Sequence, residues 1–595
     1  MAHHGPDPGC GLVSAADRTA ARAQAYAAQR QVVTADPPFA AIACPGAGKT
    51  RVIVDRHLSR AVPARQGRAI TSFTRVAAAE VHRRCVAAGR LDLTEHPHFV
   101  GTLDSFLWLH LVRPFLPPDR IWRRLESWRD APAASAAFVC GQQTYHLADA
   151  DFGYDPHTAL WSVRPTGAAR WGTPSAGWAQ QASRARAGLE RAGYLTGAEL
   201  RSHACRNLAA HTARLGALLT GKYTELVVDE AQDCSTADLY ILTKLHDAGL
   251  PLVIVADPDQ AIYGFRGAAT EALAHLAERL GRHDLTHNWR STTVICTLAA
   301  TLRSDPARRV PDTAVADHHD AAHPVLIYST NDRDAITTDF LSYATKLDIN
   351  TGDCLVLAHA QATLPKTYTG AATQPSAKAA ALAWAVGITT EYPTAPTRVR
   401  ARDVLARTVL RWWYPDADHR TPAEVLTAHG VDPAAFERLL HRVATAMPSL
   451  DQPMSTWVSA AVAVLNYHPP AGGAARTRNR LTCPATLARR TGRSVAGLPP
   501  AAAAGARPRL STVHQVKGDQ ADAVLLLMPA APATAATLTA WLTGAVPDAE
   551  VAEALRVVYV AATRARRLLG LAVPAADRDR VLAHLHRLGV PIELR

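Results

Sequence analysis

The chain has 595 residues, of which 48% are apolar in type and 19% are charged, a composition typical of a globular protein with several domains. No apolar run is long enough to cross a membrane, residues 1–13 lack the order of a secretory signal, and the nine cysteines are scattered, so we expect a cytoplasmic protein without disulfides or zinc. The formal net charge of +12 suits a polyanionic partner such as nucleic acid, although a solvated basic surface explains it equally well.

The first informative segment lies near the N-terminus, where residues 39–42 form a short apolar run typical of a buried parallel strand. A glycine-rich turn and an amphipathic stretch over residues 52–58 follow, which is the strand, loop and helix order of a phosphate-binding loop. The candidate residues of this loop for binding ATP and Mg²⁺ are Gly46, Ala47, Gly48, Lys49 and Thr50. The glycines let backbone N–H groups surround a phosphate, Lys49 is expected to reach the β- and γ-phosphates, and Thr50 is expected to bind Mg²⁺.

A second apolar run, residues 226–228, ends directly in Asp229 and Glu230. Ligands bind at the carboxyl ends of strands in open α/β sheets, so we expect both acids to face the same site. Asp229 is expected to hold Mg²⁺ through water, and Glu230 is expected to orient and deprotonate the attacking water. A solvated acidic turn is the alternative, but it leaves unexplained why the acids follow an apolar strand.

Seven further segments occur in an order that matches a known family. They are residues 29–33, 70–80, 101–106, 255–268, 288–291, 512–518 and 556–565, which read QRQVV, ITSFTRVAAAE, GTLDSF, VADPDQAIYGFRGA, NWRS, TVHQVKG and RVVYVAATRA. Together with the phosphate loop and the acidic pair, they resemble the UvrD/Rep/PcrA helicases of superfamily 1. The resemblance frames nearly the whole chain.

The resemblance implies roles for residues around the nucleotide. Gln29 would read the adenine edge, and Trp289, which replaces the usual Tyr, would stack on the adenine ring. Gln260 follows the apolar run 252–256 and is expected to sense the γ-phosphate. Arg290 and Arg564 would reach across a cleft and stabilise charge on the transferring phosphoryl group, as arginine fingers do. For a lone arginine, a surface ion pair would be the better explanation.

The resemblance also implies a path for single-stranded DNA. Its candidate contacts are Phe73, Thr74, Thr102, Tyr263, Phe265, Arg266 and His514. Aromatic rings stack on bases of any sequence, which suits a motor that must move over all of them. Core packing is the alternative for Phe73 and Phe265.

Three departures from the family pattern bear on the grip on DNA and nucleotide. Arg75 and Val76 stand where the family has Asn and Lys, and Asp104 stands where it has His. After Gly518 the chain reads DQA, where many relatives have LEF, so the ribose contact stays unassigned. None of these changes touches the residues expected to hydrolyse ATP.

The motif positions predict an α/β fold with two tandem RecA-like P-loop NTPase domains, each with a mainly helical insertion (a 1A/1B/2A/2B architecture). The expected boundaries are 14–105 and 205–284 for the ATP-binding domain 1A, 106–204 for insertion 1B, 285–365 and 505–595 for domain 2A, and 366–504 for insertion 2B. Insertion 1B has six tryptophans, Trp108, Trp122, Trp128, Trp161, Trp171 and Trp178. They fit a helical core or a surface that grips nucleic acid.

The leading functional prediction is an ATP-dependent translocase and helicase on single-stranded DNA and duplex junctions, moving 3′→5′ by resemblance, in DNA repair or antiphage defence. The compact size resembles the UvrD-like subunit of Gabija antiviral systems, which implies an OLD-type ATPase–nuclease partner. A second hypothesis is a DNA-stimulated signalling ATPase that regulates a partner nuclease without processive unwinding. A degenerate relative that only binds DNA is disfavoured, because all six expected catalytic residues are present.

Overall fold

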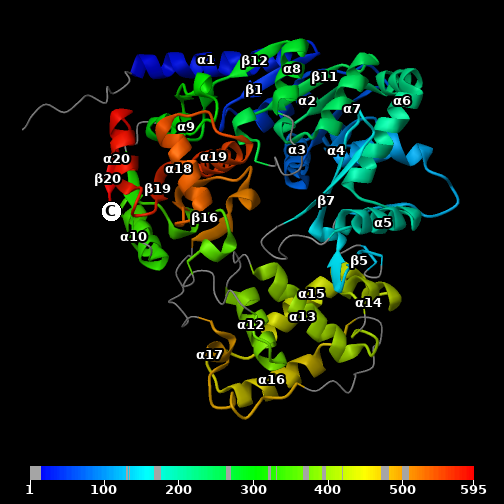
Figure 1. The fold of residues 1–595 in the computed structure, drawn as a ribbon, viewed down its shortest axis with the longest axis vertical. Helices are drawn as coiled ribbons and strands as arrows, with labels where there is room; N and C mark the ends of the chain where they lie inside the picture. The colour runs from blue at the N-terminus through cyan, green and yellow to red at the C-terminus, as the bar shows by residue number, and fades with distance from the viewer. Residues whose placement is uncertain are drawn as a thin grey trace, which may run out of the picture. The chain divides into compact units, whose positions relative to one another are not determined.

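The computed structural model describes residues 15–126, 128, 131–132, 135–166, 176–262, 270–318, 323–329, 332–365, 374–391, 397–418, 420–470, 481–498 and 508–595. The chain forms two compact units, Met1–Ala322 with Thr543–Thr563, and His323–Leu542 with Arg564–Arg595. Each unit contains helices and a parallel sheet, which confirms the α/β fold class (Figure 1). The four-part division with its expected boundaries stays a prediction. Within the described residues, no helix is both long and apolar enough to cross a membrane.

The first unit is built on six parallel strands in the order β12-β1-β11-β10-β2-β3. Their bounds are β1 (Phe39–Ala43), β2 (Gly67–Ser72), β3 (Phe99–Thr102), β10 (Tyr223–Val228), β11 (Leu252–Ala256) and β12 (Arg282–Leu285). β1 and β11 are buried along their whole length, as continuous apolar strands covered on both faces should be. The apolar runs of the sequence therefore form strands whose carboxyl ends share one edge.

Helices cover both faces of this sheet. Alternate residues of a strand point to opposite faces, so each central strand contributes side chains to two cores. Val227 and Val255 share one core with α1, α2 and α3, while Val228 and Ile254 share another with α4, α6, α7 and α8. The helices of the unit include α1 (Ala15–Thr34), α2 (Lys49–Ser59), α3 (Arg75–Ala87), α4 (Leu103–Leu107), α6 (Gly197–Lys222), α7 (Thr236–Asp247), α8 (Thr270–Leu280), α9 (Thr293–Thr301) and α19 (Ala549–Ala562). The last of these comes from the C-terminal part of the chain.

The described part of the insertion between α4 and α6 differs from the mainly helical structure predicted for it. It has the strand pairs β4–β9, β5–β6 and β7–β8 and one long helix. Their bounds are β4 (Arg123–Arg124), β5 (Ala137–Cys140), β6 (Gln143–His146), β7 (Ala150–Tyr154), β8 (Trp161–Pro165), α5 (Trp178–Arg191) and β9 (Tyr194–Leu195). The reason is the alternation of buried Phe138 and Cys140 before the left-handed Gly141, which is a strand and turn pattern.

The tryptophans of this insertion divide between core and surface. Trp178 is buried in a small core with Phe138 and α5 residues. Trp161 is half-buried, and the Arg186 guanidinium lies 3.6 Å from its ring centroid. Trp171 lies outside the described residues. Trp108, Trp122 and Trp128 are partly buried against hydrophobic cores, so core packing accounts for every described tryptophan of the insertion except Trp161.

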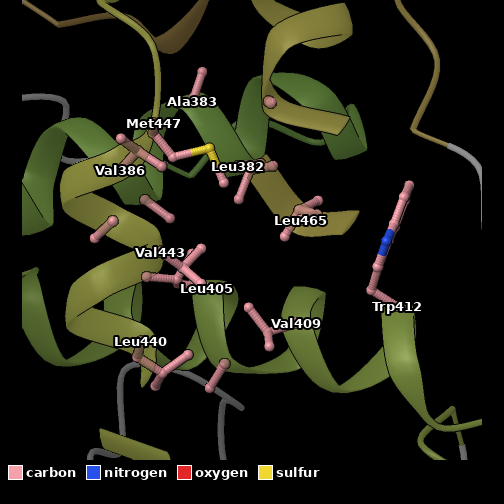
Figure 2. Packing of buried hydrophobic residues seen from close by; sticks show 14 of the residues in the cluster. Leu382, Ala383, Val386, Leu405, Val409, Trp412, Leu440, Val443, Met447 and Leu465 are labelled. Carbon is pink, nitrogen blue, oxygen red and sulfur yellow. The ribbon is translucent and has the colours of Figure 1, made fainter. Parts of the chain in front are cut away.

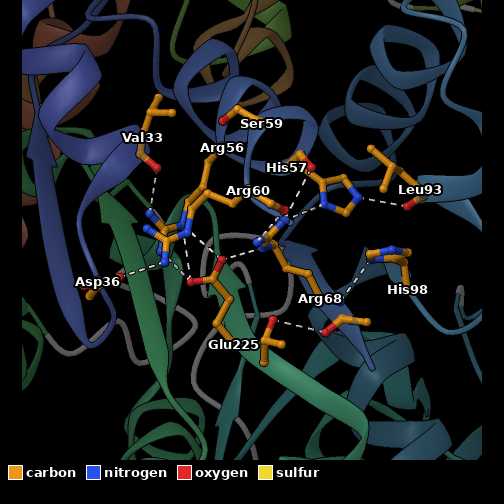
Figure 3. A network of polar contacts seen from close by, with 12 residues as sticks. Val33, Asp36, Arg56, His57, Ser59, Arg60, Arg68, Leu93, His98 and Glu225 are labelled. Atoms are coloured by element: carbon orange, nitrogen blue, oxygen red, sulfur yellow. Dashed lines mark hydrogen bonds and ion pairs between the residues drawn. The ribbon is translucent and has the colours of Figure 1, made fainter. Parts of the chain in front are cut away.

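A buried ion network ties the amino ends of β2 and β10 to the end of α2 (Figure 3). Glu225 of β10 accepts hydrogen bonds from Arg56 of α2, at 2.6 Å for the closest, and from Arg68 of β2. These three side chains are at most 2% exposed. Burial opposes ionisation of Glu225, but the two guanidinium groups outweigh it and hold its pKa below the ordinary range. Arg68 also lies 3.1 Å from Nδ1 of His57, another buried residue of α2.

The second unit has its own sheet of six parallel strands, in the order β17-β16-β18-β19-β15-β20. Its elements are β15 (Val325–Tyr328), α10 (Arg333–Lys346), β16 (Cys354–Ala358), β17 (Arg509–Thr512), β18 (Ala521–Leu527), α18 (Pro532–Thr543), β19 (Ala565–Ala572), α20 (Arg578–Arg587) and β20 (Ile592–Leu594). The apolar runs at residues 325–328, 355–358, 524–528 and 568–573 have the pattern of buried strands, and they fall on β15, β16, β18 and β19.

The described residues between β16 and β17 form a separate helical core (Figure 2). Its helices are α12 (Lys378–Glu391), α13 (Arg398–Trp413), α14 (Pro422–Ala428), α15 (Pro433–Ala446), α16 (Met454–Tyr467) and α17 (Gly492–Ala496). Leu382, Val409, Val443 and Leu465 come from four different helices and share this core. Trp457 is fully buried, and its indole N–H donates to the Pro448 carbonyl at 3.0 Å, so its polar atom is satisfied.

Candidate active site

The predicted phosphate loop lies between β1 and α2. Gly46 and Gly48 have φ of 73° and 85°, the left-handed region that other residues enter only with strain. Gly48 immediately precedes α2, so Lys49 and Thr50 form its first turn, where both are half-buried. The first N–H groups of a helix have no partner within it, and they favour an anionic ligand. The loop therefore has the backbone that phosphate binding needs.

Residues expected to contact adenine lie against this loop. The Gln29 side-chain amide donates to the Ala47 carbonyl at 2.8 Å, and the Trp289 backbone N–H donates to the Gly46 carbonyl at 2.9 Å. The Trp289 ring lies 4.8 Å from the Tyr26 ring, centroid to centroid. Tyr26 was missed from the sequence, although it precedes Gln29 by three residues and so lies on the same face of α1.

The acidic pair follows β10 directly. Burial and the neighbouring Glu230 carboxylate raise the pKa of Asp229 to about 7, and the Lys49 ammonium opposes this rise. A buried carboxylate with a raised pKa favours a cation beside it. Asp229 and the Thr50 hydroxyl offer the oxygen ligands that Mg²⁺ prefers, and Mg²⁺ commonly takes one or two protein oxygens with phosphates and water completing its shell. The donor set therefore fits Mg²⁺ bound together with a nucleotide.

Glu230 begins a relay of hydrogen bonds across the carboxyl ends of β10 and β11. Its φ of 55° is left-handed, a conformation that costs free energy outside glycine and concentrates at functional sites. Its carboxylate accepts from the Gln232 amide, whose oxygen accepts from the Asp257 backbone N–H at 3.0 Å. The Asp257 carboxylate then accepts from the Gln260 amide at 2.6 Å. Gln232 and Asp257, which sequence reasoning missed, thus connect the two predicted residues.

Hydrogen bonds hold both the backbone and the guanidinium of Arg290. The Asn288 side-chain oxygen accepts from the N–H groups of Arg290 and Ser291, at 2.7 and 2.9 Å. The Arg290 guanidinium donates to the carbonyl of Thr563, just after α19, at 2.9 Å. Arg564 begins the second stretch of the other unit, where it is 1% exposed and donates to the Asp519 carbonyl at 3.1 Å.

Three of the predicted DNA contacts surround one cavity of about 900 Å³ in the first unit. Phe73, Thr74 and Thr102 line it from the ends of β2 and β3, together with residues of β7, β8 and the start of α6. Thr74 and Thr102 also cap α3 and α4, since their hydroxyl oxygens accept from backbone N–H groups. The predicted residues Tyr263, Phe265 and Arg266 lie outside the described residues. His514 belongs to the second unit, where its ring lies 5.6 Å from that of His359.

Two departures from the family pattern have partners in this cavity. Asp104 pairs with Arg201 of α6 at 3.0 Å, and Arg201 also pairs with buried Asp238 of α7 at 2.8 Å. Arg75 pairs with Glu126 of the insertion. Each unusual charge is therefore matched by an opposite charge on another element.

Comparison with known proteins identifies part of the chain. Residues 177–280 match the family of UvrD/REP helicase N-terminal domains. This stretch is UvrD-like. It contains β10 and the acidic pair that follows it, and β11 and the turn that follows it with Gln260. Over 114 residues the chain is 29% identical to the "ATP-dependent DNA helicase srs2" of Schizosaccharomyces pombe, a match that spans 18% of this chain and 13% of that relative. The predicted resemblance to UvrD-like superfamily 1 helicases is thereby confirmed.

Proposed function

We propose that the chain is an ATP-dependent DNA helicase of the UvrD-like type, which couples ATP hydrolysis to movement along single-stranded DNA. The supporting observation is that separate motif segments meet around the phosphate loop of the first unit. Trp289 donates to Gly46, and Glu230 is linked through Asp257 to Gln260. This arrangement has a place for the phosphates, a water-activating carboxylate and a group that can sense the γ-phosphate.

In this proposal each side chain has one task in hydrolysis. Lys49 and the loop N–H groups bind the phosphates, while Asp229 and Thr50 hold Mg²⁺, which neutralises phosphate charge when bound. Glu230 orients the attacking water and accepts its proton, while the Gln232 amide donates to one oxygen of its carboxylate. The amide of Gln232 thus sets the direction of that carboxylate.

Movement along DNA requires that the binding and hydrolysis of ATP change the conformation of the rest of the chain. We propose two RecA-like domains with insertions, in which Arg290 and Arg564 act as arginine fingers and ATP closes the cleft. Single-stranded DNA would pass the cavity lined by Phe73, whose ring suits stacking on bases. By resemblance, the motor moves 3′→5′. A repair or antiphage role and an OLD-type nuclease partner remain predictions.

The test compares the wild type with Lys49→Ala, using Lys346→Ala as a control because Lys346 is an exposed lysine of the second unit. We expect single-stranded DNA to stimulate ATP hydrolysis by the wild type and the control, and hydrolysis to vanish in Lys49→Ala. Strand separation should occur on a duplex with a 3′ tail and not on one with a 5′ tail. Stimulated hydrolysis without separation would favour the signalling ATPase, and absence of hydrolysis in the wild type would refute both.

A further inference from the structure

A buried cluster of charges in the first unit lies beside the turn that contains Gln260. Its centre is Arg303, just after α9, which is 6% exposed. The Arg303 guanidinium donates to both oxygens of Asp312, at 2.7 and 2.8 Å, and lies 3.1 Å from Asp259 Oδ2. Arg308 approaches the same oxygen of Asp259 at 3.0 Å. Two cations and two anions therefore pair with each other, and of the four side chains only that of Arg308 is substantially exposed.

This cluster holds the Gln260 turn from one side. Asp259 is the middle residue of a single 3₁₀ turn, Pro258–Gln260, so its carboxylate and the Gln260 amide belong to one short rigid segment. The Asp257 carboxylate accepts from the Asp259 backbone N–H at 3.2 Å and from the Gln260 amide at 2.6 Å. A displacement of Asp259 would therefore move Gln260 with it.

Helix α19 holds the same turn from the other side. Arg556 of α19 donates to the carbonyl of Ala261, directly after the turn, at 2.7 Å. The ring of Tyr559, one helical turn further on, lies 5.8 Å from the Arg303 guanidinium carbon. α19 then ends beside Thr563, whose carbonyl accepts from Arg290. The turn and α19 are thus connected through the cluster, and each leads to a residue proposed to act on ATP.

The energetics favour a geometric role over simple stabilisation. Burying ion pairs costs solvation that their attraction hardly exceeds, so such a cluster adds little to stability but fixes distances through paired hydrogen bonds. Burial is the main cause that raises the pKa of Asp259 to about 6, against the pull of Arg308 and Arg303. Arg303 provides a planar fork that donates to the Asp312 carboxylate and to two carbonyls and also forms an ion pair with Asp259, which a single-point lysine cation would not reproduce.

We propose that Arg303 is a positioning residue for ATP hydrolysis: by bridging Asp259 and Asp312 it sets the Gln260 turn against α19. Gln260 and Arg290 are then presented together to the γ-phosphate. The proposal rests on the proposed ATPase activity. Arg303 acts through its contacts with Asp259 and Asp312, so its loss affects the hydrolytic step and leaves nucleotide binding in place.

The test measures kcat and KM for ATP, binding of a fluorescent ATP analogue and the unfolding temperature, for Arg303→Lys and for Arg308→Lys. Arg308 is the matched control, because its side chain is 31% exposed and forms one ion pair in the cluster, with Asp259. We expect Arg303→Lys to lower kcat about tenfold, the scale on which residues that couple sites act, with KM and analogue binding nearly unchanged. Arg308→Lys should change kcat by less than about threefold, since a lysine cation can keep a single contact with Asp259.

Two results would overturn the proposal. One is an unchanged kcat in Arg303→Lys, with or without a lower unfolding temperature. The other is an equal loss of analogue binding and kcat, which would indicate a general collapse of the site. If Arg303→Lys does not fold, Asp259→Asn removes the same charge pair at constant volume, and a wild-type kcat in that variant refutes the proposal. A wild type without hydrolysis that depends on Lys49 would instead refute the proposed function, and this inference with it.

Discussion

Gly46 offers the sharpest test of how the phosphate loop meets the segment that contains Arg290. A Cβ atom added at Gly46 would lie 2.5 Å from Asn288 Oδ1 and 2.6 Å from Arg290 Cβ. Ordinary contact begins at 3.4 Å, so the loop or residues 288–290 must retreat by about 1 Å, a displacement that can cost about 10²-fold in rate. We therefore expect Gly46→Ala to lower kcat/KM for ATP about 100-fold.

Left-handed strain alone does not explain such a loss, and Gly89 separates the two effects. Gly89 has φ of 72°, almost equal to that of Gly46, but no atom lies within 4 Å of an added Cβ. Gly89→Ala should therefore lose about 1 kcal/mol of stability through strain and keep its ATPase activity. At Gly48 the added Cβ would meet the flexible end of Gln29 at 2.8 Å, so Gly48→Ala should fall between the two.

The assay is steady-state ATP hydrolysis over a range of ATP concentrations, with the unfolding temperature of each variant measured in parallel. Equal kcat/KM values for Gly46→Ala and Gly89→Ala, at similar unfolding temperatures, would refute the reasoning. They would mean that residues 288–290 do not press on the loop in the active enzyme. A graded series in the order Gly89, Gly48 and Gly46 would support the close approach of the two segments.

Two further predictions concern acid stability and DNA binding. Burial lowers the pKa of His57 to about 4. Between pH 6.5 and 4 the unfolded chain therefore binds a proton at this residue and the folded chain does not, so the free energy of unfolding falls by about 3 kcal/mol as pH falls through this range. His57→Gln can donate to the Leu93 carbonyl and accept from Arg68 without titrating, so its unfolding temperature relative to wild type should rise on acidification; a constant difference from pH 7.5 to 5 would contradict this. Phe73→Ala should weaken binding of a fluorescent oligo-dT strand by about 1–3 kcal/mol if the ring stacks on a base. Tyr467→Ala, which removes a ring that is 81% exposed, should bind DNA as the wild type does, and equal affinities in both variants would argue for core packing of Phe73.

Local sequence was sufficient for the phosphate loop and the acidic strand end. The apolar run at residues 39–42 became β1, and the helix after the glycines begins at Lys49. These assignments depend on short segments whose strand, turn and helix preferences agree with the fold. The hairpins of the first insertion were not predicted, because their strands span only four or five residues and most of them lack a regular alternation of buried and exposed positions.

Tertiary contacts between distant residues could not be predicted from single motifs. Asp257 connects Glu230 to Gln260 through Gln232; each lies close in sequence to one predicted site residue, but the sequence does not show that the ends of β10 and β11 bring the two segments together. The departure at Asp104 was similarly ambiguous. From the sequence, Asp104 is an acidic residue on the predicted DNA path. The structure pairs it with Arg201, which lies almost a hundred positions away in the sequence.

The position of the proposed catalytic residues also depends on a buried ion pair outside the proposed site. Lys49 begins α2, and Arg56 lies seven residues later, about 10 Å along the helix. Asp229 follows β10, and Glu225 lies four residues earlier, about 13 Å along the strand. Because both elements are stiff over these lengths, the Arg56–Glu225 pair at one end restricts the separation of Lys49 and Asp229 at the other (Figure 3). The motifs indicate the two side chains proposed to bind phosphate and Mg²⁺, while a buried ion pair near the amino ends of the strands restricts the distance between them.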